Sequence, residues 1–404
     1  MVTWSPRRGA EQVSADPRGV SGFGVVPEET ASTRPATRER MKQLDVLRAV
    51  AVLLVMCAHV YSTAWLKRCG WVGVDLFFVL SGFLVSGLLY NEHRKRGSLS
   101  PGRFLLRRGL KIYPAFYFFV LVSVALMAYE RMAVPADRLL AEALFVQNYY
   151  GGLWGHTWSL CVEEHFYLLL TGALYLLWRR AGEGSSPFAA VPKVTLLVAV
   201  GALAARVATH LLVVPFDFQT HFKPTHLRID SLLFGVCLAY FHHFHRGRFA
   251  GAVRRWSRRI LCASLAALAP SVVYEADSVF MTTVGFTLLY LGFGGLLLLT
   301  LYCEARVPAR GALGPLAGLL AWVGGYSYSI YLWHLVVGTL GLSVFRRAYT
   351  EGASRLGGLL PPQPHYLLEF ALYVAASVGV GVLMAKLVEV PVLRLRDRYF
   401  PARG

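Results

Sequence analysis

The stretch LDVLRAVAVLLVMCAH, residues 44–59, decides the fold, because it is apolar enough to cross a bilayer and still carries Asp45, Arg48 and His59. Arg48 and His59 are eleven residues apart. An α-helix would therefore place them on one face, about three turns and roughly 16 Å apart. Asp45 precedes Arg48 by one turn, near the same face. Ionisable groups within a span are costly and usually mark a functional site. The structural alternative is an interfacial anchor formed by Asp45 and Arg48, with His59 packed into the bundle.

Similar apolar runs, separated by charged loops, recur along the whole chain. Of the 404 residues, 55% are hydrophobic and 16% are charged, with a mean hydropathy of +0.48. A soluble protein carries about a quarter charged residues. The runs lack the alternation of an outer-membrane barrel. We predict an all-α, polytopic integral membrane protein of about ten transmembrane helices, with a kink or break in the ninth near Gly324 and Gly325. The expected spans are 44–63, 72–91, 109–129, 158–178, 194–214, 229–245, 260–275, 279–302, 316–343 and 367–390.

The basic residues of the loops predict which helix ends lie in the cytoplasm. With the N-terminus inside, the inner loops and the C-terminal tail hold about 22 Lys and Arg, against about nine in the outer loops. The positive-inside rule describes this bias. We therefore expect both termini to be cytoplasmic, in a multi-pass protein of the cell (inner or plasma) membrane whose basic loops meet membrane lipid. The net charge of +18 is a topology signal on this view, and no nucleic-acid partner is expected.

Three regions follow from this pattern. Residues 1–40 are polar, rich in Pro, Gly, Ser, Thr and Arg, and predict a disordered N-terminal tail rather than a signal peptide. Residues 41–396 form the predicted transmembrane domain, and residues 397–404 a short cytoplasmic tail. Met41 is an alternative native start to Met1. Six cysteines are scattered without CxxC pairs, so we expect neither a metal site nor a disulfide framework.

Charged groups recur at the ends of later spans. Asp75 lies near the outer start of the second span. Arg103, Arg107, Arg108 and Lys111 gather where the third span leaves the cytoplasm. Such a cluster suits phosphate recognition, although any cytoplasmic loop can contain similar residues.

The segment HTWSLCVEEHFYLLL, residues 156–170, carries a carboxylate into the fourth span. Ser159 and Glu163 share a helix face by their i, i+4 spacing, so we predict that Glu163 faces the bundle. A carboxylate there needs a cation, and we expect His59 or a nearby arginine. Glu164 lies about 100° round the helix and is predicted to face solvent.

Two further segments carry polar residues with open roles. HLRIDSLLFG, residues 226–235, places Arg228 and Asp230 at the outer mouth of the sixth span, either in a site or in structural ion pairs with neighbouring helices. GGYSYSIYLWHL, residues 324–335, contains His334. A single histidine in an aromatic span is more often a packing residue, so we favour a structural role for His334.

Taken together, these segments resemble the membrane-bound acyltransferase-3 family, whose members move acyl groups from acyl-CoA to hydroxyls of sugars, glycans or macrolides. The matching stretches, in the family's order, are LDVLRAVAVLLVMCAH, GVDLFFVLSGFL, FLLRRGLKIYP, TWSLCVEEHFYLLL, HLRIDSLLFG and YSIYLWH. On this resemblance, residues 41–396 are a transmembrane acyltransferase domain. Some relatives carry a further hydrolase-like domain outside the membrane, and we expect none after the last span here.

Two family signatures are present, Arg-x10-His and SLxxExxFY, and a third, RxxR, is matched except that its last position is a lysine. They correspond to Arg48 and His59, to Ser159, Glu163 and Tyr167, and to Arg108 and Lys111. In the third signature the lysine keeps the positive charge but loses the planar fork of an arginine.

The resemblance implies an O-acyltransferase, in which an acceptor hydroxyl attacks a thioester carbonyl. That reaction needs a base, positive charge at the oxyanion and a grip on the CoA phosphates. We expect His59 to be the base, oriented by Glu163 or Asp75, with an acyl-His59 intermediate as a variant. The residues expected to hold acyl-CoA or the oxyanion are Arg48, Arg107, Arg108 and Lys111. Supporting roles are expected for Asp45, Ser159, Tyr167, Arg228 and Asp230.

The expected donor is acyl-CoA with an acetyl or other short chain, acting as a co-substrate, with no bound cofactor and no metal. The expected acceptor is a hydroxylated sugar, glycan, glycolipid or macrolide, entering from either side of the membrane. The alternative is a multi-span secondary transporter that uses the intramembrane Asp, Arg, His and Glu residues as a proton or substrate path. The chain has no convincing internal repeat to support it, and no GxSxG elbow, zinc ligand set or P-loop.

Overall fold

The computed structural model describes residues 36–59, 68–182, 186–303, 314–355 and 364–401, and these residues form helices and turns with no strand among them. The predicted all-α class is confirmed. The tail predicted to be disordered, residues 1–40, lies almost entirely outside the described residues. The last three residues of the predicted cytoplasmic tail also lie outside them.

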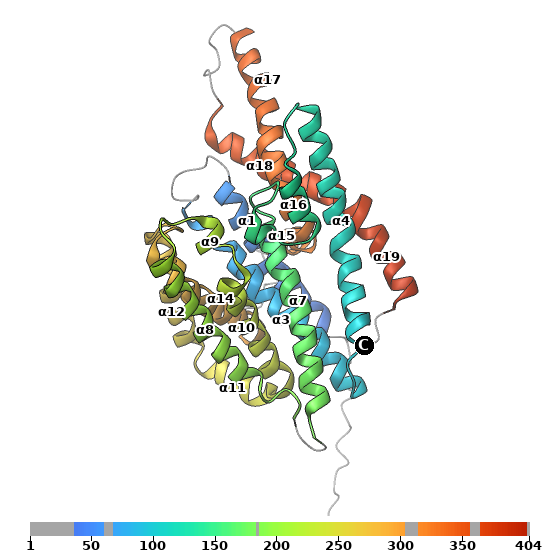
Figure 1. Ribbon diagram of the computed structural model, residues 1–404, viewed down its shortest axis with the longest axis vertical. Helices are drawn as coiled ribbons and strands as arrows, with labels where there is room; N and C mark the ends of the chain where they lie inside the picture. Colours follow the sequence, from blue (N-terminus) through green and yellow to red (C-terminus); the bar gives the residue numbers. More distant parts are fainter. Residues whose placement is uncertain (1–35, 60–67, 183–185, 304–313, 356–363, 402–404) are drawn as a thin grey trace, which may run out of the picture. The chain divides into compact units, whose positions relative to one another are not determined.

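The helices are labelled in Figure 1 and follow one another with short connections. They are α1 (Ala36–His59), α3 (Gly73–Arg96), α4 (Pro101–Tyr129), α5 (Ala136–Ala143), α6 (Gln147–Tyr150), α7 (Trp158–Arg180), α8 (Val191–Leu212), α9 (Phe218–His221), α10 (Thr225–Phe244), α11 (Arg246–Arg255), α12 (Ser257–Leu268), α13 (Pro270–Val273), η1 (Met281–Gly285), α14 (Phe286–Tyr302), α15 (Gly314–Gly325), α16 (Ser327–Val336), η2 (Val337–Gly341), α17 (Leu342–Arg355), α18 (Tyr366–Met384), η3 (Ala385–Glu389) and α19 (Val390–Tyr399).

Among the described residues, seven helical stretches are long and apolar enough to cross a membrane. They are Arg68–Arg96, Pro101–Tyr129, Trp158–Arg180, Val191–Leu212, Met281–Tyr302, Ser327–Arg355 and Tyr366–Tyr399. The count of about ten is therefore not confirmed. The predicted span at 260–275 is divided, because α12 ends at Leu268 and Pro270 begins the four-residue helix α13.

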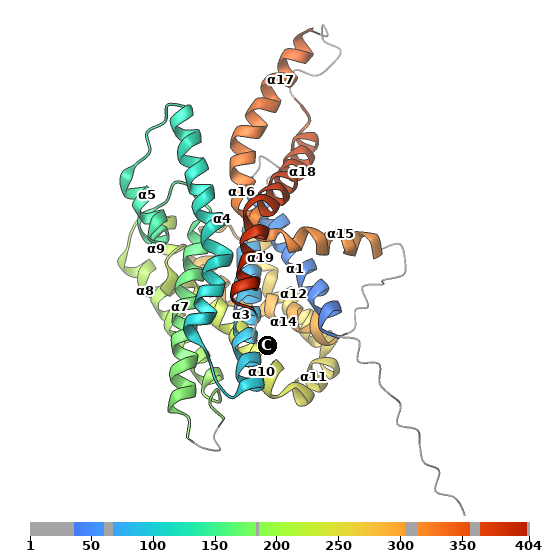
Figure 2. The ribbon, with the colours of Figure 1, turned by 90° about the vertical axis from the view of Figure 1, so that its right-hand side faces the viewer.

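The ninth predicted span is broken, as the sequence indicates, between α15 and α16 at Gly325 and Tyr326. In Figure 2, α15 runs across the direction of α3 and α4. Gly324 lies directly against the α1 backbone at Asp45, where even a Cβ atom would collide with the Asp45 carbonyl. This close approach brings the start of α16 beside the charged end of α1.

Helix α3 lies in the centre of the described helices and packs along α10. The two helices cross at glycines: a Cβ on Gly82 would meet the Leu232 backbone, and one on Gly235 would meet the backbone at Val79 and Phe83. Small residues allow this close contact between membrane helices. The packing places the polar residues of α3 and α10 next to each other.

Two buried ion pairs connect these central helices. Arg228 of α10 lies 2.8 Å from Asp75 of α3, and Asp230 of α10 lies 2.6 Å from Arg206 of α8, with all four side chains 0% exposed. The Arg228 guanidinium also lies over the Phe286 ring, 3.6 Å from its centroid. A charge in such a place persists only with a partner. For Arg228 and Asp230, the structure shows ion pairs with neighbouring helices, as the structural alternative predicts.

Candidate active site

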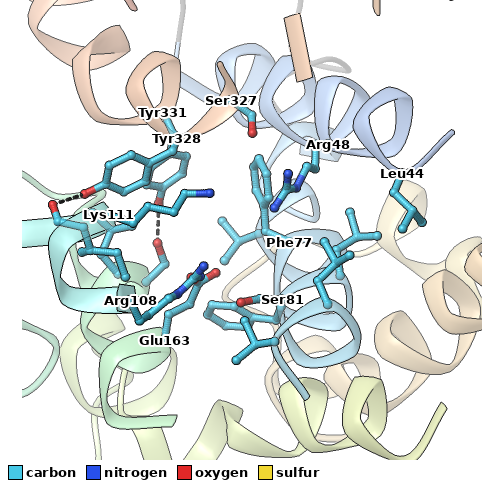
Figure 3. Close-up of a pocket in the computed structure, with 18 of the residues that line it drawn as sticks. Leu44, Arg48, Phe77, Ser81, Arg108, Lys111, Glu163, Ser327, Tyr328 and Tyr331 are labelled. Carbon is cyan, nitrogen blue, oxygen red and sulfur yellow. Dashed lines mark hydrogen bonds and ion pairs between the residues drawn. The ribbon is translucent and has the colours of Figure 1, made fainter. Parts of the chain in front are cut away.

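A cavity of about 300 Å³ lies between α1, α3, α4, α7 and α16 (Figure 3). One part of its wall is apolar and comes largely from α3, for example Phe77 and Leu84. The rest is charged or hydroxylated and consists of Asp45, Arg48, Ser81, Arg108, Lys111, Ser159, Glu163, Ser327, Tyr328 and Tyr331. The wall holds three cations and two carboxylates. Basic residues therefore outnumber carboxylates in the wall, which favours an anionic ligand with an apolar part.

Three of the predicted binding residues meet in this cavity. Figure 3 shows Arg48 entering from α1, with Arg108 and Lys111 entering from α4. The i, i+3 spacing puts Arg108 and Lys111 on one face of α4. Arg48 keeps a contact of 3.3 Å with Asp45. Lys111 forms no ion pair with any residue that the structure describes, so its ammonium group is available to a ligand.

Arg107, predicted to share this role, does not line the cavity. It donates to the backbone carbonyl of Phe400 and lies 3.0 Å from Asp397, so it holds α19 against α4. The physical reason is the rotation of about 100° between consecutive helical residues, which turns Arg107 away from the face of Arg108.

Glu163 faces the cavity, and its partner is the nearby arginine rather than His59. The Arg108 guanidinium lies 4.0 Å from a Glu163 carboxylate oxygen. Tyr167 connects the two, because its hydroxyl donates to Glu163 and accepts from Arg108 and from Ser81, the latter at 2.8 Å. The Arg108 guanidinium also stacks 4.3 Å from the centroid of the Tyr167 ring. Tyr167 thus supports the site by fixing the cation and the carboxylate together.

The prediction that Glu164 faces solvent is wrong. Its side chain is buried and accepts a hydrogen bond from the Tyr113 hydroxyl of α4. The prediction assumed that α7 has a solvent face on this side. Instead, α4 packs against it, so consecutive carboxylates on α7 both face protein.

His59 is the last residue of α1 and lies outside the wall of this cavity. Its Nδ1 lies 2.8 Å from the Val55 carbonyl oxygen. A ring nitrogen that faces a carbonyl must donate, so Nε2 carries the lone pair, which is the form that a base requires. This backbone carbonyl replaces the carboxylate that we predicted for orientation. Asp75 is paired with Arg228 and Glu163 with Arg108, and among the described interactions neither forms a hydrogen bond or ion pair with His59.

Sequence reasoning missed the neighbours of the His59 ring. It packs edge to face against His334, with 5.1 Å between ring centroids, and His334 packs in the same way against His156 at 4.9 Å. His334 is buried, and its Nδ1 lies 2.5 Å from the Tyr331 carbonyl oxygen. Burial, with a smaller contribution from His59, lowers the pKa of His156 to about 3. His156 is therefore neutral at physiological pH.

Tyr331 connects this histidine cluster to the cavity. Its hydroxyl donates to the His156 carbonyl at 2.8 Å and lies 2.5 Å from Ser159 Oγ, which therefore donates to it. Tyr331 and Ser159 line the cavity. The only sequence signal for these contacts is that His156 and Tyr331 stand within the quoted segments. Their proximity depends on the packing of α1, α7 and α16. Among the described residues, no group of three or more His, Cys, Asp or Glu has the arrangement of a metal site.

The chain is similar in sequence to known proteins. Residues 41–386 match the family described as the acyltransferase domain. The chain is 28% identical over 384 residues to the peptidoglycan O-acetyltransferase OatA of Listeria monocytogenes, covering 88% of this chain and 56% of that relative. It is 29% identical to the putative peptidoglycan O-acetyltransferase YrhL of Bacillus subtilis, covering 74% of this chain and 49% of that protein.

A putative O-acetyltransferase of Staphylococcus aureus is 26% identical, over 77% of this chain and 52% of its own length. The chain thus spans about half the length of the curated relatives it matches. No solved structure shows a significant match. Since the family match covers most of the chain and includes all of the cavity residues, this chain belongs to the acyltransferase-3 family.

Proposed function

We propose that this chain is a membrane O-acyltransferase that moves an acetyl or other short acyl group from acyl-CoA to a hydroxyl of a sugar-containing acceptor. The observation that carries the proposal is the convergence of Arg48, Arg108 and Lys111 on one cavity whose α3 wall is largely apolar. Acyl-CoA has the matching chemistry, with phosphates at one end, an extended arm and a thioester at the other. It enters the reaction as a co-substrate.

The cations at the Arg108 end of the cavity account for donor binding. Phosphate oxygens accept charge-assisted hydrogen bonds from guanidinium and ammonium groups. Because Glu163 and Tyr167 hold Arg108 in position, the guanidinium is pre-organised for its ligand. Lys111 contributes a further basic group that forms no ion pair with a carboxylate of the described residues.

His59 supplies the base on this proposal. The acceptor hydroxyl oxygen attacks the thioester carbonyl carbon while its proton moves to Nε2 of His59. When the tetrahedral intermediate collapses, the carbon–sulfur bond breaks, and the imidazolium returns the proton to the departing CoA thiolate. The hydrogen bond to the Val55 carbonyl keeps the ring in the required tautomer. Tyr331 lines the cavity and packs against His334, so on this proposal it lies between the acyl-CoA in the cavity and His59.

The acceptor proposal depends on chemistry that the relatives share. Two of them are named for O-acetylation of peptidoglycan, a glycan polymer. A glycolipid or a macrolide sugar offers the same hydroxyl nucleophile, so the acceptor panel below includes both. Family membership disfavours the secondary transporter, for which intramembrane charges were the only argument.

The test is release of free CoA from acetyl-CoA and propionyl-CoA by detergent-purified protein, with and without glycan, glycolipid and macrolide acceptors. Acceptor-dependent release is expected, and His59→Ala should reduce it by about 10²–10⁴-fold, the usual contribution of a general base. His245→Ala is the matched control, because His245 lies at the end of α10, remote in sequence from the cavity residues, and bonds Tyr240.

Unchanged CoA release in His59→Ala would support an acyltransferase but show that His59 is not its base. No release with any donor and acceptor pair, combined with accumulation of an unmodified solute in proteoliposomes, would refute the proposal in favour of a transporter.

A further inference from the structure

A second cavity, of about 290 Å³, lies at the other end of α4 and α7 from the charged start of α4. It is formed by α5, α6, the connection into α7 and its first residue, and α9 with the turn that follows it. Its side-chain wall consists mainly of Arg138, Gln147, Trp154, Trp158, Gln219 and Lys223. Among the described residues that line it there is no carboxylate, whereas Asp45 and Glu163 line the first cavity.

The wall carries two cations and a buried acceptor that lacks a donor. Lys223 donates to Gln219 at 3.2 Å and is partly buried, which lowers its pKa. Arg138 is exposed. Gln147 is 1% exposed, and its side-chain nitrogen donates to the Thr157 carbonyl at 3.2 Å. Its side-chain oxygen has no hydrogen-bond partner in the part of the chain that is described. A buried acceptor without a donor is unusual and fits a ligand hydroxyl.

The connection that forms the floor of this cavity is held rigidly. Glu142 is fully buried, and one of its oxygens accepts from the Leu153 backbone N–H at 3.1 Å and from the Thr157 hydroxyl at 2.8 Å. Gly152 is in close contact with the same carboxylate and leaves no room for a side chain. The Trp154 indole donates to Ser123 at 2.8 Å. The shape is therefore preformed, as ligand sites usually are.

Residues at the start of α7 line both cavities. Thr157 and Trp158 line the second cavity, and the next two residues of α7, Ser159 and Leu160, line the first. Ser159 is also the residue that contacts Tyr331. A molecule bound in the second cavity would thus share this turn of α7 with a ligand of the first cavity.

We propose that this second cavity binds the acceptor, and that the acceptor is a sugar bearing an anionic substituent, a carboxylate or a phosphate. The inference rests on the proposed acyl transfer, since it assigns that reaction's second substrate. Arg138 and Lys223 would pair with the anion, the partly exposed Trp154 ring would pack on the apolar face of the sugar, and Gln147 would accept from a hydroxyl. A neutral sugar would forgo the ionic contacts.

Binding is tested directly by saturation-transfer NMR on the detergent-purified protein, with N-acetylmuramic acid, N-acetylglucosamine 6-phosphate and neutral N-acetylglucosamine as probes. Stronger binding of the first or the second probe over the third supports the proposal and identifies the anion. Arg138→Gln and Lys223→Gln should each weaken binding of the anionic probe by about 10-fold, the loss of one charge-assisted contact. Lys223→Arg should retain it. Arg131→Gln is the control, because Arg131 is an exposed cation of the same outer region that does not line the cavity.

Equal binding of charged and neutral probes, or equal losses in Arg131→Gln and Arg138→Gln, would overturn the inference. The assay also separates it from the proposed function. If binding depends on the charge of the probe but no acceptor stimulates CoA release, the sugar site is supported and the acyl transfer is refuted. Acceptor-dependent release whose acceptor KM is unchanged in Arg138→Gln and Lys223→Gln leaves the enzyme in place and refutes this site.

Discussion

The pairing of Asp75 with Arg228 gives the sharpest test of how charges are used inside this protein. Both side chains are 0% exposed, and a guanidinium nitrogen of Arg228 lies 2.8 Å from a carboxylate oxygen of Asp75. Removing one member of a buried ion pair costs about 3–5 kcal/mol, because the other charge stays buried without compensation. Asp75→Asn keeps the size of the side chain and the packing of Arg228 on Phe286. We therefore expect it to lower the free energy of unfolding by about 3–5 kcal/mol.

The assay is reversible unfolding in mixed micelles, titrated with a denaturing detergent and followed by circular dichroism. The exposed Asp137→Asn is the matched control and should stay within about 0.5 kcal/mol of the parent. The double variant Asp75→Asn with Arg228→Met removes both charges and should recover most of the loss. CoA release per folded molecule should be retained in both. An Asp75→Asn protein with parental stability and no CoA release would refute the structural assignment and return Asp75 to the chemistry.

Three further predictions concern other parts of the molecule. Lys111→Ala should raise the donor KM by about 10-fold through loss of one charged contact, while Lys111→Arg and the exposed Lys95→Ala should not; an unchanged donor KM in Lys111→Ala would remove Lys111 from the phosphate site. Gly82→Val should prevent the crossing of α3 and α10 and leave little folded protein, whereas Gly201→Val, where a side chain meets open space, should fold, as size-exclusion chromatography will show. Burial raises the pKa of Glu142 to about 7 from its usual 4.5, so the folded protein holds this proton more tightly than the unfolded chain. Stability should therefore fall by up to about 3 kcal/mol as the pH rises from about 4.5 to beyond 7; Glu142→Gln, which keeps the acceptor oxygen, should remove that dependence in unfolding measured at pH 5 and pH 8, and the same slope in both proteins would contradict the assignment.

Local sequence features were enough to predict much of the candidate site. Arg108 and Lys111 stand in a basic cluster that matches a family signature, and the spacing of Ser159 and Glu163 puts them on one face of α7. In both cases the residues line the cavity. The break near Gly324 was also predictable, because two adjacent glycines interrupt an apolar run.

The helical rotation between consecutive residues explains the wrong predictions for Arg107 and Glu164. Arg107 and Glu164 each adjoin a cavity residue but point about 100° away from it. The sequence shows that rotation, but it does not show which element packs against the rotated side chain. Arg107 contacts Asp397 of α19, and Glu164 contacts Tyr113 of α4.

Sequence alone determined the helical membrane class, the family and the charged faces of individual helices, because periodicity, hydropathy and short signatures are local properties. Tertiary structure alone decided the partners. Asp75 pairs with Arg228, 153 positions away, and the His59 ring of α1 packs against the His334 ring of α16. The physical reason is that burying a charge in an apolar interior requires a partner, while the identity of that partner depends on which helices pack together.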